Sequence, residues 1–200
     1  MAKSKDINEK IKQEKRSLIL KEALKHFAAK GLFATKIKDI AEGAGIAQGL
    51  VYNYFGSKED IYIELINNAL DKINAAARGL ASMDLPAREK IRVGIAQILK
   101  TIEQSDEFNQ TCRFISQATT SSAIPEEAKR SIAVKRDQPY RLIGNIIAEG
   151  QKEGTIVEGD PYELAVLFWT TINGLAIYKA SREERPPIPK ADLLIKMFLK

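Results

Sequence analysis

Apolar residues recur along most of this chain with the spacing of an α-helix. Leu20, Ala23, Leu24 and Phe27 stand at positions i, i+3, i+4 and i+7, which places them on one face of a helix. The alternation of apolar and polar residues that is typical of strands is nearly absent, and no internal repeat occurs. The sequence therefore predicts an all-α protein of about nine to ten helices.

Residues that begin and end helices divide this pattern into segments. We expect a first helix to end near Lys30, with Gly31 as its stop. Ser57, with Asp60 three residues later, is typical of the N-cap of a helix, and that helix should fade near Gly79. In the second half we expect a helix from Pro86 to about Gln104 and another from near Asp106. Around Pro139, the segment 125–153 should form either one kinked helix or two shorter ones. Asp160 and Pro161 should begin a helix that runs to about Ala180, followed by a loop from Arg185 to Pro189 and a final helix over 190–199.

Length, cysteine content and the longest apolar stretch limit the class of protein. A chain of 200 residues can bury a core of its own. Its only cysteine, Cys112, can form no internal disulfide, so we expect a reducing compartment, the cytoplasm. The segment 164–178 is interrupted by polar residues and is too short to cross a bilayer, and the charged N-terminus has no signal-peptide character. We therefore expect no membrane partner.

Positive charge is concentrated near the N-terminus. Residues 1–60 hold twelve Lys and Arg against eight Asp and Glu, whereas the remaining 140 residues are almost balanced. A polyanionic partner would therefore meet this end of the chain, but a solvated, lysine-rich leader explains the charge equally well. Charge alone does not decide between the two interpretations.

The segment 36–55 has the layout of a helix-turn-helix. Such a motif needs a short first helix, a tight turn of small residues and a second helix with hydrogen-bonding groups on its outward face. Gly43 and Gly45 mark the turn, and the residues that would pack inward are Ile37, Ile40, Ala44, Ile46 and Val51. The outward set mixes basic, amide and aromatic groups suited to phosphates and base edges: Lys36, Lys38, Gln48, Gly49, Asn53 and Tyr54.

The run TKIKDIAEGAGIAQGLVYNYFGSKED, residues 35–60, closely resembles the DNA-binding domain of TetR-family repressors. The resemblance covers 13–73, while 80–200 shares only the family's looser pattern of a helical ligand-binding and dimerisation domain. It implies a three-helix N-terminal domain in which Tyr52 and Lys58 hold phosphates. The full set of residues that would contact operator DNA is Thr35, Lys36, Lys38, Gln48, Gly49, Leu50, Tyr52, Asn53, Tyr54 and Lys58.

Two positions depart from the family's pattern. Ala47 stands where a serine commonly caps the recognition helix, and a missing cap costs about 1 kcal/mol of helix stability. Leu50 stands where a small hydroxylated residue is common, and its side chain could contact a thymine methyl group. Tyr52 and Phe55 also fit a core role, although Tyr52 can pack its ring and still present its hydroxyl. The family therefore predicts contact with DNA but no operator sequence.

The segment 164–178 is apolar almost all round, which predicts a helix covered on more than one side. A second copy of the chain is the simplest cover. The resemblance implies the same, a homodimer through the last two long helices, over 140–153 and 162–179. A twofold dimer would suit a palindromic operator with half-sites about one helical turn apart.

A group of residues in the second half mixes aromatic bulk with scattered polar groups. It could line a pocket for an unknown small-molecule effector, as the resemblance implies, or form an ordinary core with a polar edge. Arg113, if buried, would favour an anionic or carbonyl-bearing effector. The group comprises Phe108, Cys112, Arg113, Phe114, Gln117, Phe168, Trp169, Asn173 and Tyr178.

Other classes of function find less support. His26, the only histidine, stands among lysines, and Cys112 has no histidine near it in sequence. No HExxH, P-loop or GxSxG pattern occurs, and Gly43, Gly45 and Gly49 lack the preceding strand of a dinucleotide-binding loop. We expect no catalytic residues, metal site or cofactor. A helical adaptor that binds another protein is the remaining alternative to a ligand-responsive repressor.

Overall fold

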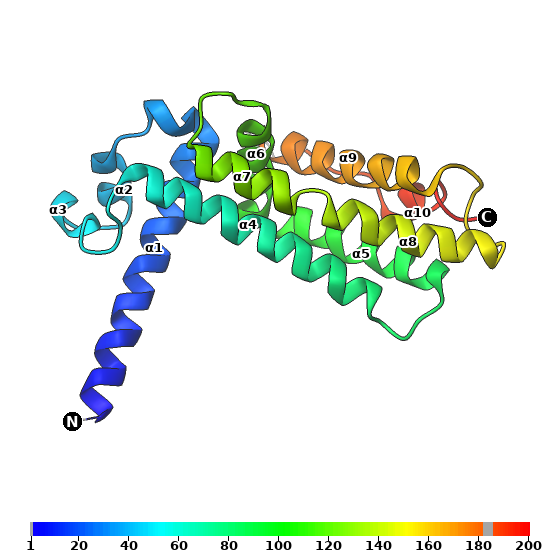
Figure 1. Ribbon diagram of the computed structural model, residues 1–200, viewed down its shortest axis with the longest axis horizontal. Helices are drawn as coiled ribbons and strands as arrows, with labels where there is room; N and C mark the ends of the chain where they lie inside the picture. Colours follow the sequence, from blue (N-terminus) through cyan, green and yellow to red (C-terminus); the bar gives the residue numbers. More distant parts are fainter. Residues whose placement is uncertain (1, 182–185) are drawn as a thin grey trace.

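The computed structural model describes residues 2–181 and 186–200, which form ten helices (Figure 1). Within these residues no strand forms, and one isolated antiparallel bridge joins Ile156 to Leu199. The predicted all-α fold is confirmed. The helices are α1 (Ala2–Ala34), α2 (Ile37–Gly43), α3 (Gln48–Val51), α4 (Lys58–Ala81), α5 (Ala87–Gln104), α6 (Asp106–Thr120), α7 (Glu126–Lys135), α8 (Gln138–Lys152), α9 (Pro161–Ala180) and α10 (Ala191–Ile195).

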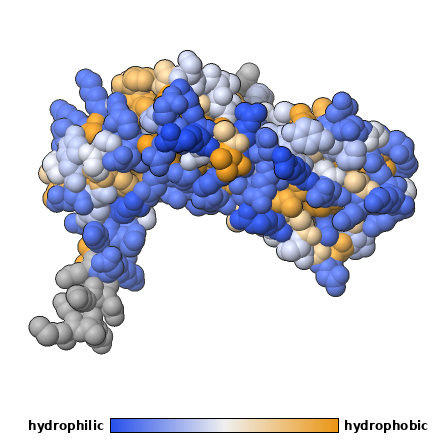
Figure 2. Space-filling view, in the orientation of Figure 1, coloured by the Kyte–Doolittle hydropathy of each residue, from blue (hydrophilic) through white to orange (hydrophobic). Residues whose placement is uncertain are grey.

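The molecule is elongated, with a head at one end and a body at the other (Figure 1). We call α1 to α3 with the first turns of α4 the head, and α5 to α10 with the rest of α4 the body. The N-terminal part of α1 projects away from both. Figure 2 shows a face that is largely hydrophilic and is broken by separate hydrophobic patches. None of the described helices is long and apolar enough to span a membrane.

Local signals set several helix ends as predicted. Gly31 interrupts α1 with φ 77° and ψ 176°, a conformation open to glycine but strained for other residues. The Ser57 hydroxyl accepts a hydrogen bond from Asp60 N at 3.0 Å and begins α4. Asp160 begins α9 in the same way, because its carboxylate accepts bonds from two backbone amides at 2.9 Å.

Two further helix ends have different causes, one local and one dependent on a distant segment. The chain breaks between α7 and α8 instead of kinking, and Pro139 lies in the first turn of α8, where its missing N–H costs no helical hydrogen bond. The final helix was expected to reach residue 199 but ends at Ile195. Phe198 O instead accepts from Val157 N at 2.9 Å, and Lys200 N donates to Thr155 O at 3.1 Å. Arg185, in the predicted loop, lies outside the described residues, while 186–189 are non-helical.

Buried side chains form two clusters that meet at α6. The head cluster contains residues of α1 to α4 together with Phe114 and Ala118 of α6 and Ala128 and Ile132 of α7. The body cluster contains residues of α5, α8, α9 and α10 together with Cys112 and Ile156. The Tyr62 ring packs edge-on against Phe27 and Phe114, with centroids 5.2 and 4.9 Å apart. This aromatic group joins α1, α4 and α6, so the head is packed directly against the wall of the body.

Candidate nucleic-acid interface

α2 and α3 form the predicted helix-turn-helix. The buried residues Ile40 of α2 and Val51 of α3 hold both helices on the head cluster. Gly45, in the turn, has φ 64°, a left-handed conformation that favours glycine. Ile46 N closes the turn by donating to Ala41 O at 3.0 Å. Regular α3 is only four residues long, and backbone bonds continue the turn to Phe55.

Most residues predicted to contact DNA are exposed on this motif. Leu50 is 42% exposed and Tyr52 51% exposed, although both carry large apolar surfaces. No side chain caps α3 at Ala47, as expected. A Cβ at Gly49 would meet no heavy atom within 4 Å, so packing inside the protein does not require glycine there. The exposed members of the predicted set are Lys36, Lys38, Gln48, Gly49, Leu50, Tyr52 and Asn53, and Tyr54 and Lys58 are half-buried.

Thr35 differs from the other predicted contacts because its side chain is buried. It is 1% exposed, and its hydroxyl donates to Gly31 O at 2.7 Å. The Lys58 ammonium donates to Thr35 O at 2.9 Å, which ties the start of α4 to the chain before α2. Lys58 is also the first residue of α4, and the backbone amides at a helix N-terminus favour an anion. The Thr35 hydroxyl instead supports the bend after α1.

Arg16 contacts both the end of the helix-turn-helix and α4. Its guanidinium carbon lies 4.6 Å from the centroid of the Phe55 ring, and its two terminal nitrogens donate to both carboxylate oxygens of Glu64. The contact therefore joins α1 and α4 to the residue that follows the α3 turn. Sequence reasoning missed Arg16, because a partner 48 residues away leaves no local signal.

A second ion pair joins α1 to α2. The Lys30 ammonium donates to the Asp39 carboxylate, and this hydrogen bond holds the pKa of Asp39 below its usual value. Lys38 Nζ, by contrast, lies 3.7 Å from Glu42 Oε1 in an exposed i,i+4 pair. Such a pair contributes little to the stability of the fold. The Lys38 ammonium can therefore leave Glu42 for a polyanion at a low cost in free energy.

The body contains a cavity of about 750 Å³ walled by α4, α5, α6, α8 and α9. Five residues of the predicted pocket line it, namely Phe108, Cys112, Phe168, Trp169 and Asn173. The α4 and α5 walls, with Ile73 and Ile98, were not anticipated, because their apolar faces look like those of ordinary core helices.

The other four residues of the predicted pocket do not line this cavity. Phe114 is buried in the aromatic group of the head cluster. Arg113 is half-buried on α6, and Tyr178 is 41% exposed on α9. Gln117 is exposed and donates to Ala28 O at 3.2 Å, so it ties α6 to α1.

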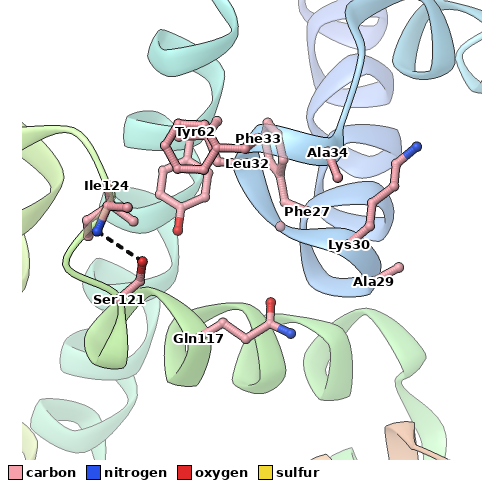
Figure 3. A pocket seen from close by; sticks show the side chains of 12 residues that line it. Phe27, Ala29, Lys30, Leu32, Phe33, Ala34, Tyr62, Gln117, Ser121 and Ile124 are labelled. Carbon is pink, nitrogen blue, oxygen red and sulfur yellow. Dashed lines mark hydrogen bonds between the residues drawn. The ribbon is translucent and has the colours of Figure 1, made fainter.

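Gln117 lines a smaller cavity, of about 430 Å³, where the head meets the body. Figure 3 shows the Tyr62 hydroxyl and the Gln117 amide on facing walls, with Phe33 and Lys30 from the end of α1. Burial raises the pKa of Tyr62 to about 12, so its hydroxyl stays protonated at neutral pH. Phe33 is 74% exposed. Gly31 also lines this junction cavity, so the cavity lies beside the bend in α1.

Two kinds of reactive group can be checked among the described residues, metal-binding clusters and cysteine thiols. No group of three or more His, Cys, Asp and Glu among them could hold a metal ion. Cys112 is buried, and burial raises the pKa of its thiol to about 12. A thiol with so high a pKa is not a nucleophile at neutral pH.

Comparison with known proteins agrees with this geometry. Residues 19–65 match the family described as bacterial regulatory proteins, tetR family. The HTH-type transcriptional repressor KstR2 of Mycobacterium tuberculosis is 37% identical over 78 residues, and the match covers 39% of this chain and 39% of that protein. KstR2 of Rhodococcus jostii is 26% identical over 157 residues, which cover 78% of this chain and 75% of that protein.

Solved structures extend the likeness to most of the chain. The TetR family regulator PfmR from Thermus thermophilus superposes with a TM-score of 0.66 at 25% identity and covers 89% of this chain and 92% of its own. The ketosteroid transcriptional regulator KstR2 of Mycobacterium tuberculosis shares the fold, with a TM-score of 0.73 at 22% identity over 92% and 95% of the two chains. Residues 19–65 therefore form the N-terminal domain of the tetR family of bacterial regulatory proteins, and the chain as a whole shares the fold of TetR-family regulators.

Proposed function

We propose that this regulator is a homodimeric repressor that binds a palindromic operator through α3 and leaves the DNA when a small molecule occupies the body cavity. One observation carries the proposal. α6 lines the cavity with Phe108 and Cys112 and, two residues later, inserts Phe114 into the head cluster. A ligand in the cavity and the position of the head therefore act on the same helix.

The outward face of α3 and of the turn that follows it supports sequence-specific contact with DNA. Gln48 and Asn53 are exposed amides, the side chains that pair in bidentate fashion with adenine in the major groove. Tyr52 and Lys58 flank them with a phenol and an ammonium suited to phosphates. We infer that the amides supply discrimination between sequences and that Tyr52 and Lys58 supply affinity.

An exposed stripe on α9 supports dimerisation. Four residues three or four positions apart share one face and are exposed, and Leu167 is 50% exposed on it. A stable interface buries about 800 Å² on each partner, so neighbouring α8 would add its exposed polar residues as a rim. A dimer built on this stripe would present two heads to the two halves of an operator. The stripe consists of Leu167, Thr170, Gly174 and Tyr178.

Release by a ligand follows from the packing of α6. Phe114 contacts Phe27 of α1 and Tyr62 of α4, and Gln117 holds Ala28 O. A shift of α6 toward or away from the cavity would carry these contacts with it. Because both half-sites must be met together, a small change in the position of each head would weaken operator binding.

Binding to genomic fragments tests the proposal. Operator DNA selected from the source genome should be bound with a steep salt dependence, and Lys58→Gln should lower the slope of log K against log salt by about 0.9 for each phosphate that the ammonium neutralises. Gln48→Ala and Asn53→Ala should instead reduce discrimination between operator and unrelated DNA. Lys100→Gln, at an exposed position on α5, is the matched control and should change neither.

Two results would contradict the proposal. Unchanged affinity, salt slope and discrimination in the three α3 and α4 variants would remove α3 from the interface. A monomer at micromolar concentration in light scattering would remove the half-site model. Neither outcome would change the fold, and a lack of DNA retention even at low salt would favour the adaptor alternative.

A further inference from the structure

We propose that the ligand of the body cavity is an anionic amphiphile, with an apolar chain or ring system inside and one anionic group at the mouth beside Lys72 and Arg136. This inference rests on the proposed function, since it names the chemical class of the effector. It is drawn from the distribution of charge over the lining of the cavity.

The buried part of the lining is apolar. Its most buried side chains come from α4, α8 and α9, and no charged residue of the lining is buried. An ionised group placed there would lose its hydration without a partner. The enclosed part of a ligand must therefore be uncharged and largely apolar. The buried lining residues are Ala69, Leu70, Ala77, Cys112, Pro139, Ile143, Phe168 and Ile172.

The charged part of the lining is confined to exposed positions. Lys72, Glu107 and Arg136 are the charged residues among the described ones that line the cavity, and all three are exposed. Lys72 lies 4.0 Å from Glu107, and Arg136 Nε lies 3.3 Å from Asp137. Exposed pairs of this kind are weak, so either cation can exchange its carboxylate for the anionic group of a ligand. The lining itself holds two cations and one acid, because Asp137, the partner of Arg136, does not line the cavity.

Neutral polar groups also line the cavity. Tyr140 and Asn173 line the cavity and are half-buried. Burial raises the pKa of Tyr140, so its hydroxyl remains a donor at neutral pH. A ligand can therefore carry a carbonyl or hydroxyl between its apolar part and its charged end. The volume of about 750 Å³ lies within the range of small-molecule sites.

A charge series on one chain length tests the inference. Trp169 is the only tryptophan and lines the cavity, so its fluorescence reports occupancy. The full chain is titrated with dodecanoate, dodecyl phosphate, dodecanol and dodecyltrimethylammonium, each below its micelle concentration. We expect one or both anionic probes to bind about twofold to thirtyfold more tightly than the alcohol, the range for two exposed charge pairs, and the cation to bind most weakly.

Variants of the mouth make the test specific. The double variant Lys72→Gln with Arg136→Gln should bind the anionic probes and dodecanol with equal affinity, whereas Lys100→Gln should keep the wild-type preference. Tighter binding of dodecyl phosphate than of dodecanoate would identify a phosphate-bearing ligand, and the reverse order a carboxylate. Equal binding of alcohol and acids by the wild type, a preference that survives the double change, or no binding of any probe would overturn the inference.

Release of operator DNA is measured separately with the same probes. If an anionic probe binds with the expected preference but leaves the DNA complex intact, the ligand class stands and the proposed ligand response fails. If the protein binds and discriminates DNA but takes up no probe, the ligand class fails and the DNA-binding part of the proposed function stands. The two failures are therefore distinguishable.

Discussion

Replacing Gly49 with alanine should separate what α3 needs for folding from what it needs for DNA binding. The new Cβ would meet no heavy atom of the protein within 4 Å, and residue 49 is helical. A glycine-to-alanine change at a compatible position stabilises a protein by about 0.4–1 kcal/mol, mainly because the unfolded chain has fewer conformations. For a chain of this size that corresponds to a rise in melting temperature of about 1–4 °C.

The same methyl group should weaken operator binding. If the backbone of α3 approaches the base edges at Gly49, the added atom must be accommodated in a packed interface, which costs about 1–3 kcal/mol. The loss of affinity would be about 5-fold to 150-fold for each head, and both heads of a dimer would carry it. The variant should thus be more stable and bind DNA less tightly, opposite effects that a general folding defect cannot produce.

Gly79→Ala is the matched control. Gly79 is also a helical glycine near a helix end, and a Cβ there would likewise meet nothing within 4 Å. It should raise the melting temperature by a similar amount without changing operator affinity. Thermal unfolding and fluorescence anisotropy on the same preparations give both quantities. Wild-type affinity in the Gly49 variant would refute the argument that the backbone approaches DNA closely at this residue.

Three further changes test other parts of the argument. Leu167→Glu should give a monomer in analytical ultracentrifugation, whereas Leu193→Glu, at a leucine 61% exposed on α10, should leave the dimer intact; a dimer in both would place the interface elsewhere. Phe114→Ala should lower the free energy of unfolding in urea by about 3–5 kcal/mol, because the ring is 1% exposed in the aromatic group; a decrease below about 1 kcal/mol would contradict this packing. Burial raises the pKa of Cys112 from 9.0 to about 12, so above pH 9 the unfolded state binds fewer protons than the folded state, and stability falls as the pH rises. This thiol alone should cost about 1.4 kcal/mol at pH 10, and Cys112→Ala should flatten the alkaline slope of urea midpoints; an unchanged slope would show that the thiol does not contribute.

Local chemistry explains why several predictions from the sequence hold. The cap at Ser57, the bend at Gly31 and the start of α9 at Asp160 each involve atoms within four residues of one another. Such features depend on backbone geometry that the residue type largely determines. The helix-turn-helix belongs to this group, because its turn and its inward face lie within about twenty residues.

Features that depend on distant partners could not be predicted in this way. The last helix stops early because 198–200 pair with 155–157, and nothing in the local sequence at the C-terminus signals that contact. Cys112 and Phe114 are both apolar and stand two residues apart, but a helix turns about 200° between them, so one lines the cavity and the other enters the head. The pattern identifies apolar positions without identifying which neighbour each one meets. Thr35 is a related case, since its hydroxyl is satisfied inside the protein by Gly31 O.

The exceptions in α3 carry their own information about function. Within four consecutive residues the helix lacks a side-chain cap at Ala47, has glycine at its second position and exposes Leu50 at 42%. The missing cap alone costs about 1 kcal/mol, and glycine in a helix adds about 0.5–1 kcal/mol. Residues that break local rules without compensation inside the protein are expected where function requires them. A Cβ at position 49 has open space around it and Leu50 has solvent, so nothing inside the chain compensates for these costs, and the proposed contact with DNA would do so.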